Sequence, residues 1–283
     1  MEIGADARVA APASKEARND AWIRGEVADA ARLLRERNLA HANEVAAPVR
    51  PRRTVYGRFV KRGLDVALSA AALLVTAPVN LVLAGLTYLD VGSPVLFRQR
   101  RQGRGLSEFT MVKFRNMTND TDQNGELLPV DQRITRFGYF VRNHSLDELL
   151  NFWSVLKGDM SLIGPRPLPV EFTERMTERH RARYAVRPGL ECPAMSERPE
   201  GMDPAHFRFE NDVAYVESLS FATDVRQALR LVAVVFRRAG SSPYTGTDGH
   251  FIGYDRNGEA MSQGRLKDPA TYRREVLGEG DAE

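Results

Sequence analysis

The longest hydrophobic stretch of the chain runs from residue 66 to residue 89 and contains no charged side chain. Its length of about 24 residues is enough for a helix that crosses a bilayer core, which is about 30 Å thick. Pro78 lies near the middle, where it removes a backbone donor and favours a kink. Each half then spans only about 17 Å, at 1.5 Å per residue. The pattern therefore predicts a membrane helix with a break at Pro78.

Both flanks of this stretch are basic, whereas a crossing helix is expected to have one basic side. A helix–break–helix hairpin that enters and leaves by the same membrane face accounts for both observations, and a kinked single-pass helix is the alternative. Thr76 and Asn80 are placed to satisfy the backbone at the break, because hydrocarbon offers no hydrogen bonds. The basic residues are Arg52, Arg53, Arg58, Lys61 and Arg62 before the stretch, and Arg98, Arg100, Arg101 and Arg104 after it.

Shorter patterns beyond this stretch predict an α+β fold that is mainly helical. Two apolar segments separated by a Gly- and Arg-rich turn predict short strands, and three longer segments predict helices. The part from 224 to 238 is amphipathic, which suits a membrane surface or packing against a core equally well. The strands are expected over 94–97 and 109–114, and the helices over 145–157, 170–184 and 208–238, with 187–205 irregular.

These patterns divide the chain into three parts. Residues 1–55 form an N-terminal extension, partly helical or disordered, with a helix predicted over 21–39 that includes Trp22 and Ile23. Residues 56–240 form the main domain. Residues 241–283 are expected to form a polar, loose C-terminal tail.

Composition narrows the class of protein. The 283 residues are 43% hydrophobic and 27% charged, which excludes a mostly disordered chain and a protein with many membrane spans. A single cysteine excludes a disulfide framework, and the N-terminus shows no secretory signal. The arginine-rich segments would suit a nucleic-acid binder, but a net charge of +3 and the apolar stretch argue against one.

The segment Ser145-Leu146-Asp147-Glu148 has two interpretations. A serine followed three residues later by glutamate is the pattern of a capping box at a helix N-terminus. The same helix start also attracts phosphate, and an aspartate there can attack phosphorus while its neighbour holds a divalent metal. Magnesium is the natural ion for carboxylate and phosphate oxygens. The second hypothesis makes Asp147 the nucleophile and Glu148 the Mg²⁺ ligand.

Cationic side chains are candidates for binding the phosphates. Arginine suits bidentate phosphate contacts, although solvated surface charge is the ordinary explanation for any one of them. Arg166 is the favoured candidate, because Pro165 and Pro167 restrict its backbone and reduce the entropy lost on binding. The five histidines are scattered, so a zinc site is not expected. The candidates are Lys113, Arg115, Arg133, Arg142 and Arg166.

Taken in order, several blocks of sequence resemble the bacterial sugar transferases, the monotopic polyprenol-phosphate phosphoglycosyl transferases. The resemblance covers about residues 56–240, and the ordered series is far more specific than any one block. The blocks are Lys61-Arg62-Gly63-Leu64-Asp65; residues 92–99; Lys113-Phe114-Arg115-Asn116-Met117; residues 133–138; residues 145–149; and Leu156 to Pro167, with weaker similarity at Arg187-Pro188-Gly189 and Asp212 to Ser218.

The resemblance implies a fold, a reaction and a location. The fold is a re-entrant membrane helix hairpin over 66–89, a small cytoplasmic catalytic domain and interfacial amphipathic helices. Asp147 would attack the sugar-linked phosphate of a UDP-sugar and release UMP, and polyprenol (undecaprenyl) phosphate would then take the phosphosugar. Glu148 would hold Mg²⁺ and Arg166 would grip a phosphate. The protein would act at the cytoplasmic face of the bacterial inner membrane, initiating exopolysaccharide or related glycan assembly.

Two segments depart from the family pattern. Leu150-Asn151 replaces the usual Pro-Gln after Asp-Glu-Leu, and Leu190-Glu191-Cys192 replaces the usual Ile-Thr-Gly. The second change bears on recognition of the nucleotide or sugar. It therefore keeps open an alternative, a catalytically inactive membrane-anchored scaffold of a polysaccharide assembly complex. The sequence does not fix which sugar is carried, or whether the chain forms a homo-oligomer.

Overall fold

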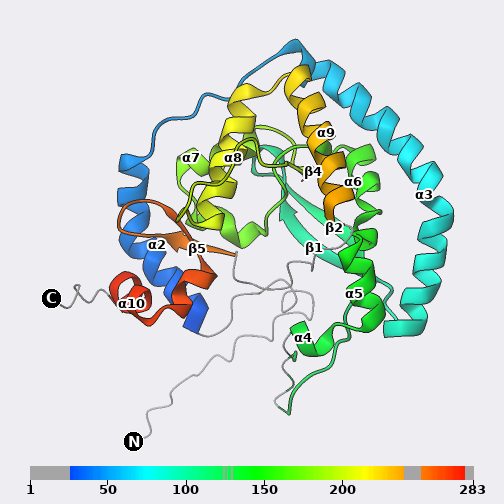
Figure 1. Ribbon diagram of the computed structural model, residues 1–283, viewed down its shortest axis with the longest axis horizontal. Coiled ribbons are helices and arrows are strands. Elements are labelled where there is room, and N and C mark those ends of the chain that lie inside the picture. Colours follow the sequence, from blue (N-terminus) through cyan, green and yellow to red (C-terminus); the bar gives the residue numbers. More distant parts are fainter. Residues whose placement is uncertain (1–25, 124, 126, 129, 239–249, 278–283) are drawn as a thin grey trace, which may run out of the picture.

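The computed structural model describes residues 26–238, except 124, 126 and 129, and residues 250–277. Helices dominate this part of the chain, and its strands form three two-stranded sheets (Figure 1). The predicted fold class, α+β and mainly helical, is confirmed.

A single long helix contains the apolar stretch. A short π-helical segment, η1 (Tyr56–Val60), leads into α3 (Lys61–Val91), which continues through Pro78. The predicted helix–break–helix form is therefore not observed; α3 bends as one helix (Figure 1). Thr76 and Asn80 bond along the same helix, since the Thr76 hydroxyl donates to the Ala72 carbonyl and the Asn80 amide donates to Thr76 Oγ1. Helices tolerate proline when neighbouring polar groups compensate in this way.

Most of α3 has no protein covering. Within the part of the chain that the structure describes, Tyr56–Val91 is the one helix long and apolar enough to cross a membrane, and only 11% of its most apolar window is buried. Leu74 and Leu89 expose more than three quarters of their side chains. A helix buried in a soluble core would not show this exposure, so α3 indicates association with a membrane.

The N-terminal end of α3 is fixed to the rest of the protein. Arg62 donates to the last carbonyls of α6 (Asn151–Lys157), at 2.6 and 2.9 Å. Asp65, which is buried, accepts hydrogen bonds from Ser161 Oγ and from the Leu162 backbone N–H, both at 3.0 Å. These residues open β3 (Ser161–Ile163).

The C-terminal end of α3 is fixed to the same body. Asp90 accepts a hydrogen bond of 2.6 Å from Thr135, the N-cap of α5 (Arg136–Asn143). Arg115 donates to the carbonyls of Val91 and Gly92 at the end of the helix. Both ends of the apolar helix therefore lie on one domain.

The domain core is built around two small sheets. β1 (Leu96–Gln102) and β2 (Glu108–Phe114) pair antiparallel, which confirms the two predicted strands, although β1 extends into the predicted turn. β3 pairs in parallel with β4 (Gly189–Glu191), inside the segment predicted to be irregular. A short helix, α4 (Val130–Arg133), precedes α5.

Each of the three predicted helices is interrupted. The first consists of the 3₁₀ turn η3 (Leu146–Glu148) followed by α6, and the last divides at Leu219 and Ser220. In the middle one, extended Met176 and Thr177 separate two pieces, and the Thr177 side chain caps the second by accepting from the His180 N–H. The remaining pieces are η4 (Val170–Arg175), α7 (Glu178–Arg181), η5 (Ala182–Ala185), α8 (Pro204–Ser218) and α9 (Phe221–Arg238).

Two segments far apart in the sequence, α2 (Glu26–Val45) and residues 250–277, pack together and are here called the annex. The prediction of a loose tail is wrong for 250–277, because its strands are buried against α2 and the main domain. Trp22 and Ile23 of the predicted N-terminal helix lie outside the described residues. The annex elements after α2 are β5 (Phe251–Tyr254), β6 (Ala260–Ser262), η6 (Gln263–Lys267), α10 (Pro269–Tyr272) and η7 (Arg273–Leu277).

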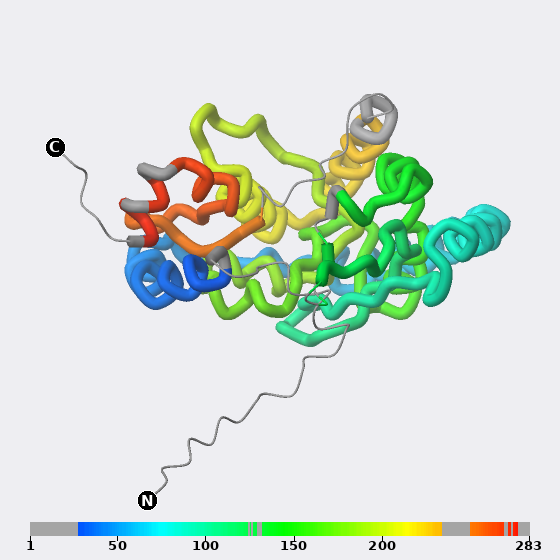
Figure 2. Tube along the Cα trace, turned by 90° about the horizontal axis from the view of Figure 1, so that it is seen from below, coloured from blue at the N-terminus to red at the C-terminus, as the bar shows by residue number. Residues whose placement is uncertain are grey.

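The annex is joined to the main domain by buried polar contacts as well as apolar ones. Within the annex, Asn38 of α2 donates to the Tyr254 carbonyl at 2.7 Å. The Tyr254 hydroxyl accepts from the Thr177 backbone N–H at 2.9 Å and contacts His180 Nδ1 at 2.8 Å. The annex and α3 lie at opposite ends of the molecule in both views (Figures 1 and 2), so the annex stands away from the apolar helix.

Because both ends of α3 bind one domain, we predict that the residues flanking it face the same side of the membrane. Cysteines introduced at Arg53 and Arg104, both exposed, should react with an impermeant maleimide from the same face of sealed vesicles. The native Cys192 is buried and serves as the unreactive background. Labelling of the two positions from opposite faces would show that α3 crosses the bilayer.

Candidate active site

The turn that carries Asp147 and Glu148 is not a capped helix start. Ser145 adopts a left-handed conformation, with φ of 53° and ψ of 25°, and its side chain caps nothing. The capping-box interpretation is therefore wrong. A left-handed serine is strained unless its surroundings hold it. Here the Ser145 N–H bonds to the Arg142 carbonyl and the Ser145 carbonyl accepts from the Glu148 N–H, which connects the end of α5 to the 3₁₀ turn η3.

Glu148 is held by two cations from different elements. Lys113 of β2 contacts Glu148 Oε1 at 2.5 Å, and Arg166, in the turn after β3, contacts the same oxygen. Burial alone would raise the pKa of the Glu148 carboxyl, but Arg166 and Lys113 outweigh it and lower that pKa to about 2. Glu148 is therefore a permanent carboxylate whose charge is already compensated.

Asp147 sits in a different environment one residue earlier. It is 6% exposed, and the Asn116 side-chain amide donates to its Oδ2 at 3.1 Å. Burial raises the pKa of Asp147 to about 6, with the neighbouring charge of Glu148 adding to the rise and Lys113 and Arg142 opposing it. Adjacent carboxylates thus differ sharply in proton affinity, a pattern typical of catalytic sites.

Arg166 is fixed from its other side by the parallel strands. Its Nη1 donates to the Leu190 carbonyl at 3.2 Å and lies 3.4 Å from a Glu191 carboxylate oxygen. The strands approach so closely here that a Cβ on Gly189 would lie 2.1 Å from the Gly164 nitrogen. Glycine at this position therefore allows the contact that brings Glu191 to Arg166.

The backbone of Arg166 is supported by a buried ion pair. Arg183 of η5 donates to the Arg166 carbonyl at 2.6 Å. It also lies 2.9 Å from Asp212 of α8, with side chains 1% and 4% exposed. A buried ion pair of this kind contributes more to selecting one arrangement of the chain than to the free energy of unfolding. Here it supports the backbone of the turn that carries Arg166.

Comparison with known proteins identifies the family. The model of the bacterial sugar transferase family matches residues 56–238, more than half of the chain. The chain belongs to the bacterial sugar transferase family. This confirms the resemblance found in the ordered blocks of sequence.

Three relatives show the extent of the likeness. The sugar transferase EpsL of Bacillus subtilis is 38% identical over 59% of this chain and 82% of its own length. An exopolysaccharide production protein, PSS, of Rhizobium leguminosarum is 36% identical over 59% of this chain and 90% of its own. The UDP-N-acetylgalactosamine-undecaprenyl-phosphate N-acetylgalactosaminephosphotransferase of Aeromonas hydrophila is 33% identical over 65% of this chain, but the match covers only 45% of that relative. These names support the predicted enzyme class, a phosphoglycosyl transferase.

Not all the predicted cations of the sugar transferase meet at Asp147 and Glu148. Lys113 and Arg166 do, and Arg142 acts on Asp147 through its charge. Arg115 instead binds backbone carbonyls at the end of α3, because its guanidinium closes that helix. Arg133 donates to the Leu128 carbonyl at 2.7 Å and to the Thr118 carbonyl at 3.4 Å, within its own loop. Both guanidiniums help to fix the backbone, and their assignment as phosphate ligands stays a prediction.

The structure also reveals residues that the sequence did not single out. Asn116 lies inside a recognised block, so the block pointed to it without giving its role. Glu191 was visible as a departure from the family pattern, and the structure places it against Arg166. Asp212 opens a block of weaker similarity that did not give its role, and Arg183 gave no signal, because a charged residue's burial depends on tertiary packing.

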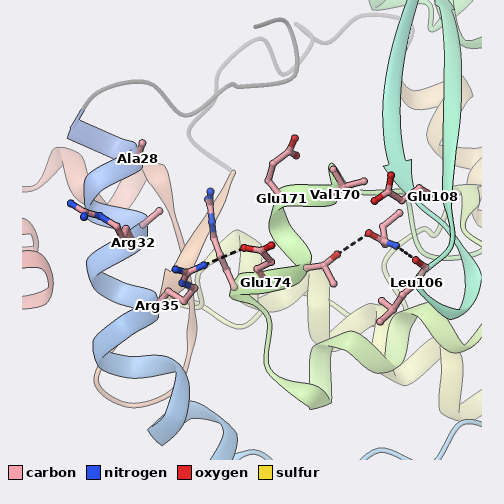
Figure 3. A pocket seen from close by; sticks show the side chains of 12 residues that line it. Ala28, Arg32, Arg35, Leu106, Glu108, Val170, Glu171 and Glu174 are labelled. Atoms are coloured by element: carbon pink, nitrogen blue, oxygen red, sulfur yellow. Dashed lines mark hydrogen bonds and ion pairs between the residues drawn. The ribbon is translucent and has the colours of Figure 1, made fainter. Parts of the chain in front are cut away.

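A cavity of about 600 Å³ lies elsewhere, between the annex and the main domain. Arg32 and Arg35 of α2 line one side, and Glu171 and Glu174 of η4 line another (Figure 3). Arg35 pairs with Glu174 across it at 3.2 Å. None of the predicted site residues lines this cavity, so it is separate from the Asp147 site.

The raised pKa of Asp147 has a consequence for stability. The folded protein binds the Asp147 proton more tightly than the unfolded chain does, so stability falls as pH rises from about 4 through about 6. A shift of two pKa units corresponds to at most about 3 kcal/mol. We predict that Asp147→Asn melts several degrees higher than wild type at pH 7.5, and that the difference vanishes near pH 4, as measured by thermal unfolding in detergent.

The exposed Asp29 on α2 provides the matched control, and Asp29→Asn should melt like wild type at both pH values. An Asp147→Asn variant no more stable than wild type at pH 7.5 would contradict the unfavourable burial of this carboxylate.

Proposed function

We propose that this sugar transferase moves a phosphosugar from a UDP-sugar to undecaprenyl phosphate, releasing UMP, through a covalent intermediate on Asp147. The observation that carries the proposal is the pairing of two unlike carboxylates. Glu148 is neutralised by Lys113 and Arg166, whereas Asp147 is buried without an ion pair and bonds only to a neutral amide among the described side chains. Its remaining oxygen is available to attack phosphorus.

Binding of the donor diphosphate would use cations that are already in place. Lys113 and Arg166 are fixed at Glu148, and Arg142 is near Asp147, with a buried Nη1 that has no hydrogen-bond partner. Positive charge held by the fold stabilises a phosphoryl transition state without reorganisation at the moment of reaction. These three side chains would orient the sugar-linked phosphate toward Asp147.

The reaction then consists of two displacements at one phosphorus. A carboxylate oxygen of Asp147 attacks the phosphorus that carries the sugar, and the bond from that phosphorus to UMP breaks, leaving an acyl phosphate. A phosphate oxygen of undecaprenyl phosphate next attacks the same phosphorus, and Asp147 leaves as a carboxylate. The product is a sugar joined to the lipid by a diphosphate. A pKa of about 6 keeps most of Asp147 ionised at neutral pH.

The chemistry of Glu148 suits a magnesium ion. Lys113 and Arg166 both contact Oε1, so Oε2 is left for another partner, and the side chain is 21% exposed. Magnesium is commonly held by one or two protein carboxylates, with substrate phosphates and water completing its shell. Bound there with the donor, the ion would offset negative charge on the phosphates.

The membrane setting follows from α3 and its neighbours. Because both ends of α3 bind one domain, we favour a re-entrant course in which both ends of the helix stay at one membrane face. We place the domain at the cytoplasmic face of the bacterial inner membrane, monotopic, with α9 as an interfacial helix. Exposed apolar side chains on α5, α6 and α9 support this placement; they are Tyr139, Phe140, Trp153, Phe221, Val225, Leu229 and Val232.

The inactive-scaffold alternative rested on the changed segment 190–192, and that reason for it is now weaker. The changed segment 190–192 is part of the site, since Leu190 and Glu191 both contact Arg166. The four side chains that the proposed reaction needs are all present in the site; they are Asp147, Glu148, Lys113 and Arg166. The relative from Rhizobium is named for exopolysaccharide production, and we assign this chain to the first step of such an assembly.

Release of UMP is the direct test. Purified protein with Mg²⁺, undecaprenyl phosphate and a panel of UDP-sugars should release UMP from at least one donor. Asp147→Asn should reduce the rate by roughly a thousandfold or more, the scale of loss when a nucleophile is removed. Asp29→Asn, on the surface of α2, should retain the wild-type rate.

Mass spectrometry of the wild-type protein mixed with donor alone should show a sugar-phosphate adduct on Asp147. Rapid turnover by Asp147→Asn would remove this residue as the nucleophile. A folded wild type that releases no UMP from any donor would favour the scaffold.

Metal dependence tests the role of Glu148. Chelation with EDTA should abolish UMP release, and added Mg²⁺ should restore it. Glu148→Gln should raise the Mg²⁺ concentration for half-maximal rate by about tenfold or more, because the amide carries no charge for the ion. Glu171→Gln, an exposed residue at the separate cavity, is the control and should leave the Mg²⁺ response unchanged. Full activity in EDTA would contradict the proposal.

A further inference from the structure

Asn116 makes the one side-chain hydrogen bond to Asp147 found among the described residues. Its Nδ2 donates to Oδ2 at 3.1 Å. Lys113 and Arg142 influence Asp147 through charge, but neither forms a hydrogen bond with it. The two carboxylate oxygens of Asp147 are therefore unequal, since Oδ2 has a fixed donor and Oδ1 has none from a side chain.

The backbone that carries Asn116 is held on both sides. The Arg115 N–H bonds to the Val95 carbonyl at 2.9 Å, and Met117 forms an antiparallel bridge with Ile134. α5 packs directly on the Asn116 carbonyl, since a Cβ on Gly138 would lie 2.0 Å from that oxygen. The amide of Asn116 thus projects from a fixed base toward the turn that bears Asp147.

We propose that Asn116 is a positioning residue that holds Asp147 by Oδ2 and leaves Oδ1 as the atom that attacks phosphorus. This inference rests on the proposed function and extends it to the choice of oxygen. A neutral amide suits this role because it can neither take the proton of the carboxyl nor cancel its charge.

The test is the split between kcat and KM for UMP release, measured at pH 7.5 for wild type, Asn116→Ala and Asn116→Asp, together with the rate at which donor alone forms the adduct on Asp147. In Asn116→Ala the Asp147 carboxylate loses its side-chain donor, so kcat and the rate of adduct formation should both fall by about tenfold or more. The donor KM should stay within about twofold of wild type, and the melting temperature should stay close to that of wild type.

Asn116→Asp keeps the shape of the side chain and replaces the donor with a second carboxylate. It should lose at least as much kcat as Asn116→Ala, because a carboxylate beside Asp147 repels it instead of donating to it. Its near-identical size also keeps the inference testable if Asn116→Ala does not fold. Asn43→Ala, on α2 of the annex, should reproduce the wild-type kcat and KM.

The outcomes separate this inference from the proposed function. A wild-type kcat in both variants would overturn the role of Asn116 and leave the transferase intact. A loss of kcat accompanied by a raised donor KM and a lowered melting temperature would also overturn it, because that result reports a structural role. A wild type that releases no UMP from any donor would overturn both.

Discussion

The site depends on the contact of one carboxylate with two cations. Lys113 and Arg166 come from separate sheets and meet at the same oxygen of Glu148. Without Glu148, the two cations would repel each other, and without the cations its charge would be buried at high cost. Asp147, one residue earlier, is buried without an ion pair among the described side chains, and burial raises its pKa to about 6. The reactivity proposed for Asp147 depends on this contrast between two adjacent carboxylates.

The same need to satisfy buried groups fixes the membrane helix. Asp65 enters the domain because the backbone N–H of Leu162 and the hydroxyl of Ser161 both bond to it. At the other end Arg115 closes α3; it directly follows β2 and precedes Asn116. The apolar helix and the candidate active site thus share the segment at the end of β2. A lipid-borne acceptor would meet the site at the surface where this helix is fixed.

The sequence predicted which residues meet at the candidate site because the blocks of the family keep their order. Asp147, Glu148, Lys113 and Arg166 were all named from sequence, and the structure brings them together. The contacts of Arg115 and Arg133 with backbone carbonyls were not foreseen, because an arginine that binds carbonyls looks the same in sequence as one that binds phosphate. The break at Pro78 was overestimated because proline removes one helix bond, which the rest of a long helix tolerates. The tail was misjudged because the buried strands β5 and β6 are short and are flanked by polar residues, so no long apolar pattern marks them in the sequence.

The annex lies outside the region shared with the family, yet it is not a separate folding unit. Ala42 of α2 and Phe251 and Tyr254 of β5 share one buried cluster with Leu168 and Phe172. Leu168 follows the Arg166 turn by two residues, and Phe172 belongs to η4. Side chains in a packed core restrict one another's positions. The residues of α2 and β5 in this cluster therefore support the segment that follows Arg166. The family match ends at residues 56 and 238, and these positions limit the sequence similarity only. The hydrophobic core that supports the site includes residues on both sides of them.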